Sequence, residues 1–255
     1  SHREMFQDTV HSLIVQPDDG IAPILNTIEG AKKSLDIKMF QFTDPILINA
    51  VIEAHKRGVK VRVMLNPSRF TGEHDNDEAF TRFRDAKVPV EETNPKYPIT
   101  HEKSMVIDRG AALISSFNLA DKYFTETRDY GIVSANAAVV AQVIAGFEAD
   151  WNRVFFEPDL HVGLVWSSSH SRGQMARIID SASRSLWIQH PKFVDAVILD
   201  RIISARERGV KVRLLCGGKH GISDWDIYDT FASLRIMQRF GVKAVSYTHL
   251  TLPTK

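Results

Sequence analysis

Helix-like and strand-like patterns of apolar residues alternate along the first part of the chain. Residues 21–33 carry apolar side chains at helical spacing, and residues 34–42 alternate in the manner of a strand. An Asp-Pro pair opens a helix predicted over residues 44–55, and Gly58 is typical of the residue just past a helix end. The β-branched run at residues 59–65 predicts the next strand.

The same order of elements occurs a second time. Residues 28–65 align with residues 179–216 without a gap, and the run RGVKVR stands in both segments. Two helix–strand units that converged by composition are the alternative, but the shared turn residues favour a tandem duplication. Alternating helices and strands in each copy predict an α/β sandwich, with strands packed between helices.

The repeat sets the expected domain boundaries. A helix predicted over residues 135–153 closes the first copy, and the polar, proline-containing segment that follows reads as a linker. We therefore predict a first repeat at residues 1–158 and a shorter second repeat at residues 159–244. Residues 245–255 break from the repeat and resemble the translation of a sequencing adapter, so we predict a non-native tail, with an ordinary C-terminal tail as the alternative.

Composition narrows the function classes. With 44% hydrophobic and 25% charged residues the chain is typical of a globular protein, and its net charge of +1 argues against a protein that coats nucleic acid. The single cysteine, Cys216, lies in an apolar run and is expected in the core. No stretch approaches the roughly 20 apolar residues that span a bilayer. Nothing has zinc-like ligand spacing, so we expect neither a metal nor a cofactor.

The chemistry is concentrated between residues 100 and 131. Residues 104–108 read as a strand and residues 111–114 as its antiparallel partner, with Arg109 and Gly110 in a tight turn between them. Because strand side chains alternate, His101 and Lys103 are expected on one face. The returning strand is expected to bring further polar residues beside them, which suits the binding of a phosphoryl group.

These residues resemble the signature of the phospholipase D superfamily, which reads His-x-Lys, four residues, Asp, and later a Gly/Ser-Ser-x-Asn turn. His101, Lys103 and Asp108 have that spacing, and residues 115–118 (Ser-Ser-Phe-Asn) stand at the turn, with serine replacing the usual glycine. The amino-acid sequences of both halves are similar to those of bacterial cardiolipin synthase-like members. The resemblance implies a tandem-duplicated sandwich of mixed sheets flanked by helices, with the second repeat incomplete.

The resemblance and the chemistry imply the same roles. His101 has a nitrogen that is neutral and nucleophilic near pH 7, so it can take the phosphoryl group covalently in the first of two steps. Lys103, Ser116 and Asn118 are expected to donate to the phosphoryl oxygens. For Asn118, shaping its turn is the alternative.

Two aspartates and two histidines have less certain places in this scheme. Asp129 stands where the family commonly has a glutamate that orients the histidine, and pairing with a neighbouring cation is its alternative. Asp108 is assigned to substrate binding, although a structural role is favoured for it. His190 and His220 are counted as substrate-binding candidates. His190 begins a second His-x-Lys, but Val197 stands where the motif requires aspartate, and the repeat aligns His190 with a strand residue.

The family usually needs two such motifs, one histidine attacking and the other protonating the leaving group. The repeat predicts the second His-x-Lys near or beyond residue 250, where the chain reads THLTLPTK. We therefore expect a C-terminally truncated member that is weakly active at most.

The favoured function is a metal-independent phospholipase D-like phosphodiesterase or phosphatidyltransferase acting on phospholipids through a phosphohistidine. A superfamily nuclease that cleaves DNA and a non-catalytic phosphate-binding module are the alternatives. The expected partner is a phospholipid or other phosphodiester, with peripheral membrane contact and with nucleic acid disfavoured. The expected location is cytoplasmic or peripheral at the inner membrane face.

Overall fold

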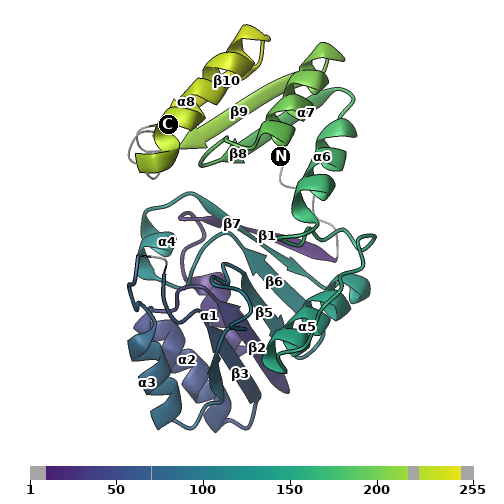
Figure 1. Ribbon diagram of the computed structural model, residues 1–255. Helices are drawn as coiled ribbons and strands as arrows, with labels where there is room; N and C mark the ends of the chain where they lie inside the picture. The colour runs from purple at the N-terminus through teal and green to yellow at the C-terminus, as the bar shows by residue number, and fades with distance from the viewer. Residues whose placement is uncertain (1–9, 70, 218–223, 248–255) are drawn as a thin grey trace. The chain divides into compact units, whose positions relative to one another are not determined.

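The chain folds into two compact units that divide between Gly163 and Leu164 (Figure 1). The computed structural model describes residues 10–69, 71–217 and 224–247. The division falls a few residues after the predicted boundary at 158, beyond the segment proposed as a linker.

The first unit is built on a seven-stranded mixed sheet with the strand order β1-β7-β6-β5-β2-β3-β4. Strands β2, β3 and β4 are parallel to one another, whereas β5, β6, β7 and β1 add to the other side of β2 in antiparallel fashion. The elements in chain order are β1 (His11–Gln16), α1 (Ala22–Glu29), β2 (Ser34–Met39), α2 (Pro45–Lys56), β3 (Lys60–Leu65), α3 (Asp77–Asp85), β4 (Val90–Glu92), β5 (Lys103–Ile107), β6 (Ala111–Ser115), α4 (Asp121–Thr125), β7 (Asp129–Ser134) and α5 (Ala137–Trp151).

The central strand β2 separates two different layers. Its Leu35, Ile37 and Met39 are fully buried in the main apolar core, together with the inward faces of α1 and α2. Its Asp36 and Lys38 point to the opposite face. There Lys38 pairs with Asp150 of α5, and Asp36 pairs with Arg62 of β3, which also binds Glu148 of α5. Helices α1, α2 and α3 contact one another in series, and α5 lies on the other side of the sheet (Figure 1). The predicted α/β sandwich is therefore confirmed.

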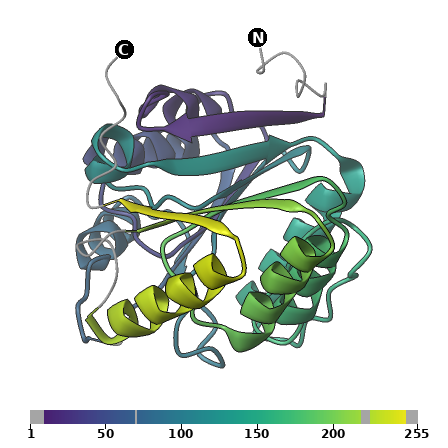
Figure 2. The ribbon, with the colours of Figure 1, turned by 90° about the horizontal axis from the view of Figure 1, so that it is seen from above.

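The second unit has a smaller, parallel sheet with the order β10-β9-β8. Its helices pack on one face of this sheet (Figure 2), around a core of its own. The elements are α6 (Ser171–Asp180), β8 (Ser185–His190), α7 (Ala196–Glu207), β9 (Lys211–Gly217), α8 (Asp224–Arg239) and β10 (Lys243–Tyr247). Within the described part of this unit, nothing corresponds to strands β5, β6 and β7 of the first.

The duplication extends to individual hydrogen bonds. Arg57, just past α2, donates through Nη2 to the carbonyl oxygens of residues 28, 29 and 31. Arg208, just past α7, donates in the same way to those of residues 179, 180 and 182. The next residue in each copy, Gly58 or Gly209, has a φ of +94° or +91°, a conformation that favours glycine. The shared run RGVKVR therefore builds the same helix end twice.

The segment predicted to be a foreign tail begins within a strand. Strand β10 runs parallel to β9 and pairs Val245 with Leu215. This pairing continues the sheet past residue 244, where the second repeat was predicted to end. The foreign origin of residues 245–255 stays a prediction, and residues 248–255 lie outside the described part of the chain.

We predict that removing the cap of α2 destabilises the first unit. The Asp44 side chain accepts hydrogen bonds from the backbone N–H groups of Ile46 and Leu47, at 2.9 and 3.1 Å, and Asp44 is 4% exposed. Asp44→Ala leaves those donors unpaired and should lower the free energy of unfolding by about 1 kcal/mol. Urea denaturation followed by circular dichroism measures the change. Glu53→Ala, at an exposed position of the same helix, is the control, and an equal loss in both variants would contradict the capping role.

Candidate active site

The polar residues of the signature meet at one edge of the first sheet because four strand ends coincide there. Strand β5 begins at Lys103, two residues after His101, and Lys103 pairs with Met39 at the end of β2. Strand β6 ends just before Ser116, and its neighbour β7 begins at Asp129. Antiparallel pairing of β5, β6 and β7 therefore brings residues distant in sequence to the same edge.

His101 and Lys103 form a direct pair at this edge. The Nζ of Lys103 lies 3.1 Å from Nδ1 of His101 and donates to the His101 carbonyl oxygen at 2.7 Å. The ring of Phe40, from the end of β2, lies 4.5 Å from the imidazole between centroids and 5.4 Å from the Lys103 ammonium. The expectation that both side chains share one face is confirmed. Lys103 is 5% exposed, whereas His101 is covered in part by Phe40 and Lys103 and keeps the rest of its surface open to solvent.

The pair has unusual proton affinities. Burial against its neighbours, followed by the positive charge of Lys103, lowers the pKa of His101 to about 4. Burial also lowers the pKa of Lys103 to about 8, although the carboxylates of Asp129 and Glu102 act in the opposite direction. At neutral pH the imidazole is therefore neutral and the ammonium is still charged, which is the state that nucleophilic attack on a phosphoryl group needs.

Ser116 and Asp129 are brought together, but Asp129 has a different partner from the predicted one. The Ser116 hydroxyl donates to Asp129 Oδ1 at 2.8 Å, and the hydroxyl of Thr127 donates to Oδ2 at 2.6 Å. Among the described residues Asp129 has no hydrogen bond to His101, whose Nδ1 faces Lys103 instead. Asp129 acts on the pair through its charge, which favours a protonated Lys103.

Asn118 is held firmly beside the site. It is 4% exposed, its Oδ1 accepts from the backbone N–H of Gln41 at 3.0 Å, and its Nδ2 donates to the hydroxyl of Tyr123 at 3.1 Å. The turn that carries it is fixed by Phe117, which packs against Gly131 so closely that a Cβ there would come within 3.0 Å of the ring. Asn118 thus ties its turn to the segment after β2 and to α4, and one of its two amide N–H donors is already engaged. Both its phosphate-binding role and the turn-shaping alternative stay predictions.

Asp108 lies at the opposite end of β5 and is not part of this cluster. Its carboxylate accepts from the backbone N–H groups of Lys32, Lys33 and Ser34, between 2.6 and 3.2 Å. Burial would raise the pKa of Asp108, but these N–H donors hold it below its usual range. Seven residues of extended chain separate Asp108 from His101, or roughly 20 Å. The substrate-side assignment of Asp108 is therefore wrong, and the structural alternative holds.

The hairpin turn also differs from its prediction. The N–H of Gly110 donates to the carbonyl of Ile107 at 3.0 Å, so the two central residues are Asp108 and Arg109. Both have positive φ, +53° and +55°, as in the turns that match strand twist. Aspartate tolerates this conformation. The predicted turn at Arg109–Gly110 is therefore wrong by one residue, because Asp108 and Arg109 are its central residues.

The two other histidines predicted to bind substrate are His190 and His220. His190 ends β8 in the second unit, where its Nδ1 lies 2.6 Å from the carbonyl oxygen of Lys192. The Lys192 ammonium pairs with Asp226 at 2.7 Å, so the second His-x-Lys does not reproduce the His101–Lys103 contact. His220 lies outside the described residues.

Three contacts of the site were missed from sequence: Phe40, Tyr123 and Thr127. Tyr123 and Thr127 lie within the stretch that carries the signature, at residues 100–131, so proximity in sequence was an available signal. Phe40 comes from a different part of the chain, and only the pairing of β2 with β5 brings it to His101.

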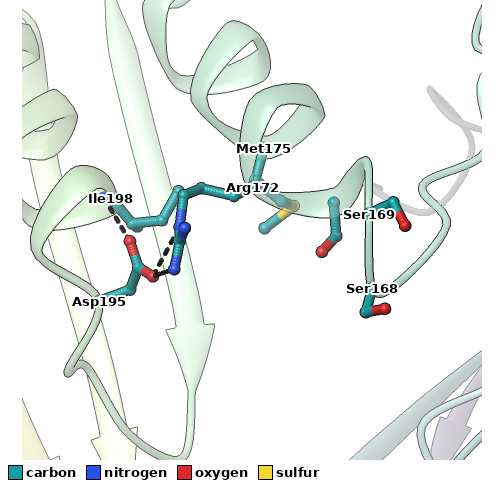
Figure 3. A pocket seen from close by; sticks show the side chains of 7 residues that line it. Ser168, Ser169, Arg172, Met175, Asp195 and Ile198 are labelled. Atoms are coloured by element: carbon teal, nitrogen blue, oxygen red, sulfur yellow. Dashed lines mark hydrogen bonds and ion pairs between the residues drawn. The ribbon is translucent and has the colours of Figure 1, made fainter.

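The second unit also contains a pocket, which is a weaker candidate for the active site. It has a volume of about 320 Å³ and is lined by Ser168, Ser169, Ser171, Arg172, Met175, Asp195 and Ile198 (Figure 3). The guanidinium of Arg172 is held by Asp195 at 2.8 Å, and Asp195 also caps α7. The arginine charge is thus already neutralised within the pocket.

Two kinds of feature are absent from the described residues. These residues contain no group of three or more His, Cys, Asp or Glu side chains arranged to hold a metal ion. Within the same ranges, no helix combines the length and apolar character required to cross a bilayer.

Comparisons with known proteins agree with the residue pattern. Phospholipase D Z of Dictyostelium discoideum is 23% identical over 218 residues, covering 73% of this chain and 50% of that protein. The human mitochondrial cardiolipin hydrolase is 25% identical over 174 residues, covering 68% of this chain and 66% of that protein. A phospholipase D of Rickettsia felis is 30% identical over 126 residues, or 47% of this chain and 59% of that one. The chain spans about half the length of the curated relatives it matches.

Solved structures show the same fold. The phosphatidylserine synthase of Haemophilus influenzae matches with a TM-score of 0.66 at 12% identity, over 83% of this chain and 62% of that one. Nuc of Salmonella typhimurium, a phospholipase D family member, matches with a TM-score of 0.51 at 23% identity, over 58% of this chain and 99% of that one.

A family model supplies the assignment. The model described as "Cardiolipin synthase, PLD-like domain" matches residues 24–151 and 175–252, which together make up most of the chain. The two matched segments fall on either side of the division between the units. The chain belongs to the cardiolipin synthase, phospholipase D-like domain family.

Proposed function

We propose that this chain carries the nucleophilic half of a phospholipase D-type phosphodiesterase or phosphatidyltransferase, with His101 as the nucleophile. The single observation that carries the proposal is the 3.1 Å contact between Nδ1 of His101 and Nζ of the mostly buried Lys103. The lowered pKa values of both groups favour a neutral imidazole beside a charged ammonium at neutral pH. A histidine in this state has a lone pair available at neutral pH, and the lysine beside it can hold a phosphoryl oxygen.

In the first step, a phosphoryl oxygen takes over the hydrogen bond that Lys103 gives to Nδ1 of His101 in the structure. This releases the ring lone pair, which forms an N–P bond while the P–O bond to the leaving alcohol breaks. In the second step water or another alcohol attacks phosphorus as the N–P bond breaks, and its proton passes to the group that protonated the leaving alcohol in the first step. Water gives hydrolysis and an alcohol gives transfer, and the residues of the site serve both outcomes.

Asn118 and Lys103 are the proposed donors to the phosphoryl oxygens, and Ser116 joins them when its hydroxyl turns from Asp129 to the ligand. Asn118 retains a second amide N–H besides the one that Tyr123 accepts, and its turn fixes where that donor lies. Asp129 holds the Ser116 hydroxyl and favours the protonated form of Lys103. The scheme uses no metal. The leaving alcohol needs a proton, which we assign to a second motif that the repeat predicts near or beyond residue 250.

Phospholipid is the proposed substrate class, and contact with a lipid surface follows from it. The family description and the names of the relatives, phospholipase D and cardiolipin hydrolase, support this choice. The near-neutral net charge supports it over a nuclease, because binding a nucleic-acid duplex draws on several lysine or arginine contacts to phosphates.

We predict that the chain forms a covalent adduct at His101. A p-nitrophenyl phosphodiester is the suitable probe, because its leaving group departs without a proton donor and the half-site suffices. Mass spectrometry after a rapid quench should locate an acid-labile phosphoryl group on His101, with EDTA present throughout. His101→Ala should lower the single-turnover rate by about 1,000-fold or more, and Lys103→Met by about 100-fold.

His161→Ala, at an exposed histidine, is the matched control and should react as the wild type does. An adduct on another residue, or a reaction that EDTA abolishes, contradicts the mechanism. Labelled phosphatidylglycerol vesicles and DNA, tested side by side, distinguish the lipid enzyme from the nuclease. Preferential labelling by DNA contradicts the lipid assignment.

We also predict the pH dependence of adduct formation. Attack needs a neutral His101, whose pKa is lowered to about 4, and a protonated Lys103, whose pKa is lowered to about 8. The rate should therefore be constant between these values, fall below about pH 4 as the imidazole gains a proton, and fall above about pH 8 as the ammonium loses one. Lys103→Met should remove the alkaline limb and move the acid limb to higher pH, because the like charge beside His101 is gone. An acid limb at the ordinary histidine value in both proteins would contradict this assignment.

A further inference from the structure

The residue between His101 and Lys103 is anchored on the opposite face of the sheet. Since alternate residues of extended chain point to opposite faces, Glu102 faces away from the pair. Its Oε2 lies 2.6 Å from the Nζ of Lys38, and its Oε1 accepts from the hydroxyl of Ser104 at 3.1 Å. Lys38 has a side chain only 1% exposed and comes from β2.

Lys38 binds a second carboxylate at the same distance. Asp150, near the end of α5, has its Oδ2 2.6 Å from the same Nζ, and its Oδ1 accepts from the amide of Asn94 at 3.3 Å. The cluster therefore joins β2, the segment that enters β5, α5 and the loop after β4. With one ammonium and two carboxylates it carries a net negative charge immediately behind the His101–Lys103 pair.

We propose that Lys38 and Glu102 are positioning residues for the phosphate-binding pair: Lys38 clamps Glu102, which fixes the backbone on both sides of it, and the Glu102 carboxylate favours the charged form of its neighbour Lys103. The proposal rests on the proposed function of His101 and Lys103. Neither Lys38 nor Glu102 touches the substrate, since both side chains face the α5 layer.

The charges around Lys103 support the second part of this role. His101 and Glu102 flank it on its own segment, Asp129 faces it from β7, and Lys38 on β2 lies behind Glu102. Of these, Asp129 and Glu102 favour the ammonium against the effect of burial. Replacing Glu102 by a neutral residue should therefore lower the pKa of Lys103 below about 8.

The positioning role follows from the place of Glu102 in the chain, directly next to His101. The clamp acts on the peptide bonds directly next to the nucleophile, and a displacement of about 1 Å at a reacting group can reduce a rate by about 100-fold. The 2.6 Å contact to Asp150 is the internal comparison, because it uses the same ammonium without reaching residues 101–103.

The test compares three variants of the full chain in the single-turnover reaction with the p-nitrophenyl phosphodiester. Glu102→Ala removes the clamp and should lower the rate by about 100-fold. Asp150→Asn weakens the other arm of the same cluster and should leave the rate close to that of wild type. Glu102→Gln keeps an acceptor for Lys38 but removes the charge, so its plateau rate should stay close to wild type while its alkaline limb moves to lower pH.

Two results overturn the proposal. Equal losses in Glu102→Ala and Asp150→Asn would make the cluster a structural contact only, and an unmoved alkaline limb in Glu102→Gln would remove the role of the charge. Glu102→Gln retains the hydrogen bond to Lys38, so it remains informative if Glu102→Ala does not fold.

An NMR titration of the lysine Nζ signals separates this inference from the proposed function, with the Lys103 signal identified by its loss in Lys103→Met. If wild type forms no adduct, the proposed function fails, whereas a lower pKa of Lys103 in Glu102→Gln still supports the electrostatic role. An unchanged pKa of Lys103 in that variant overturns it whether or not the wild type reacts.

Discussion

A lysine removed from water must be paired with carboxylates or lose its affinity for a proton, and two lysines impose this condition on the first unit. Lys38 satisfies it completely: burial would lower its pKa, but Glu102 and Asp150 raise it above the ordinary value. Lys103 satisfies it only in part, and its pKa falls to about 8. The first is a permanent structural charge, whereas the second is available to an anionic ligand that would complete its pairing.

The two lysines are connected through one pair of strands. Lys38 pairs across the ladder with Ser104, and its neighbour Met39 pairs with Lys103. Strand β2 therefore supplies apolar residues to the main core on one face and the ion cluster on the other, while its end positions Phe40 against His101. Stability and site geometry depend on the same register, since a slip by one residue would exchange the two faces.

The donors around the proposed phosphate position are held before any ligand binds. Asn118 is fixed by Gln41 and Tyr123, and the Lys103 ammonium is held at His101. Donors that are already oriented need little rearrangement as charge develops, which is the main electrostatic advantage of an enzyme over water. In the repeat, β8 of the second unit corresponds to β2 of the first. The described part of the second unit has no strand beyond β8, so strands equivalent to β5, β6 and β7, and the donors that they position, are not found there.

Local patterns in the sequence determined much of this protein. The repeat, the α2 cap at Asp44, the paired helix ends at Arg57 and Arg208, and the meeting of His101 with Lys103 all follow from periodicity and short-range chemistry. The tertiary structure decided the partners: Asp108 binds backbone N–H groups at the far end of β5, and Asp129 binds hydroxyl groups rather than the imidazole. Sequence spacing specifies which residues share a strand, but which side chain meets which depends on strand register and on the helix that covers each face, and both are set by contacts between distant segments.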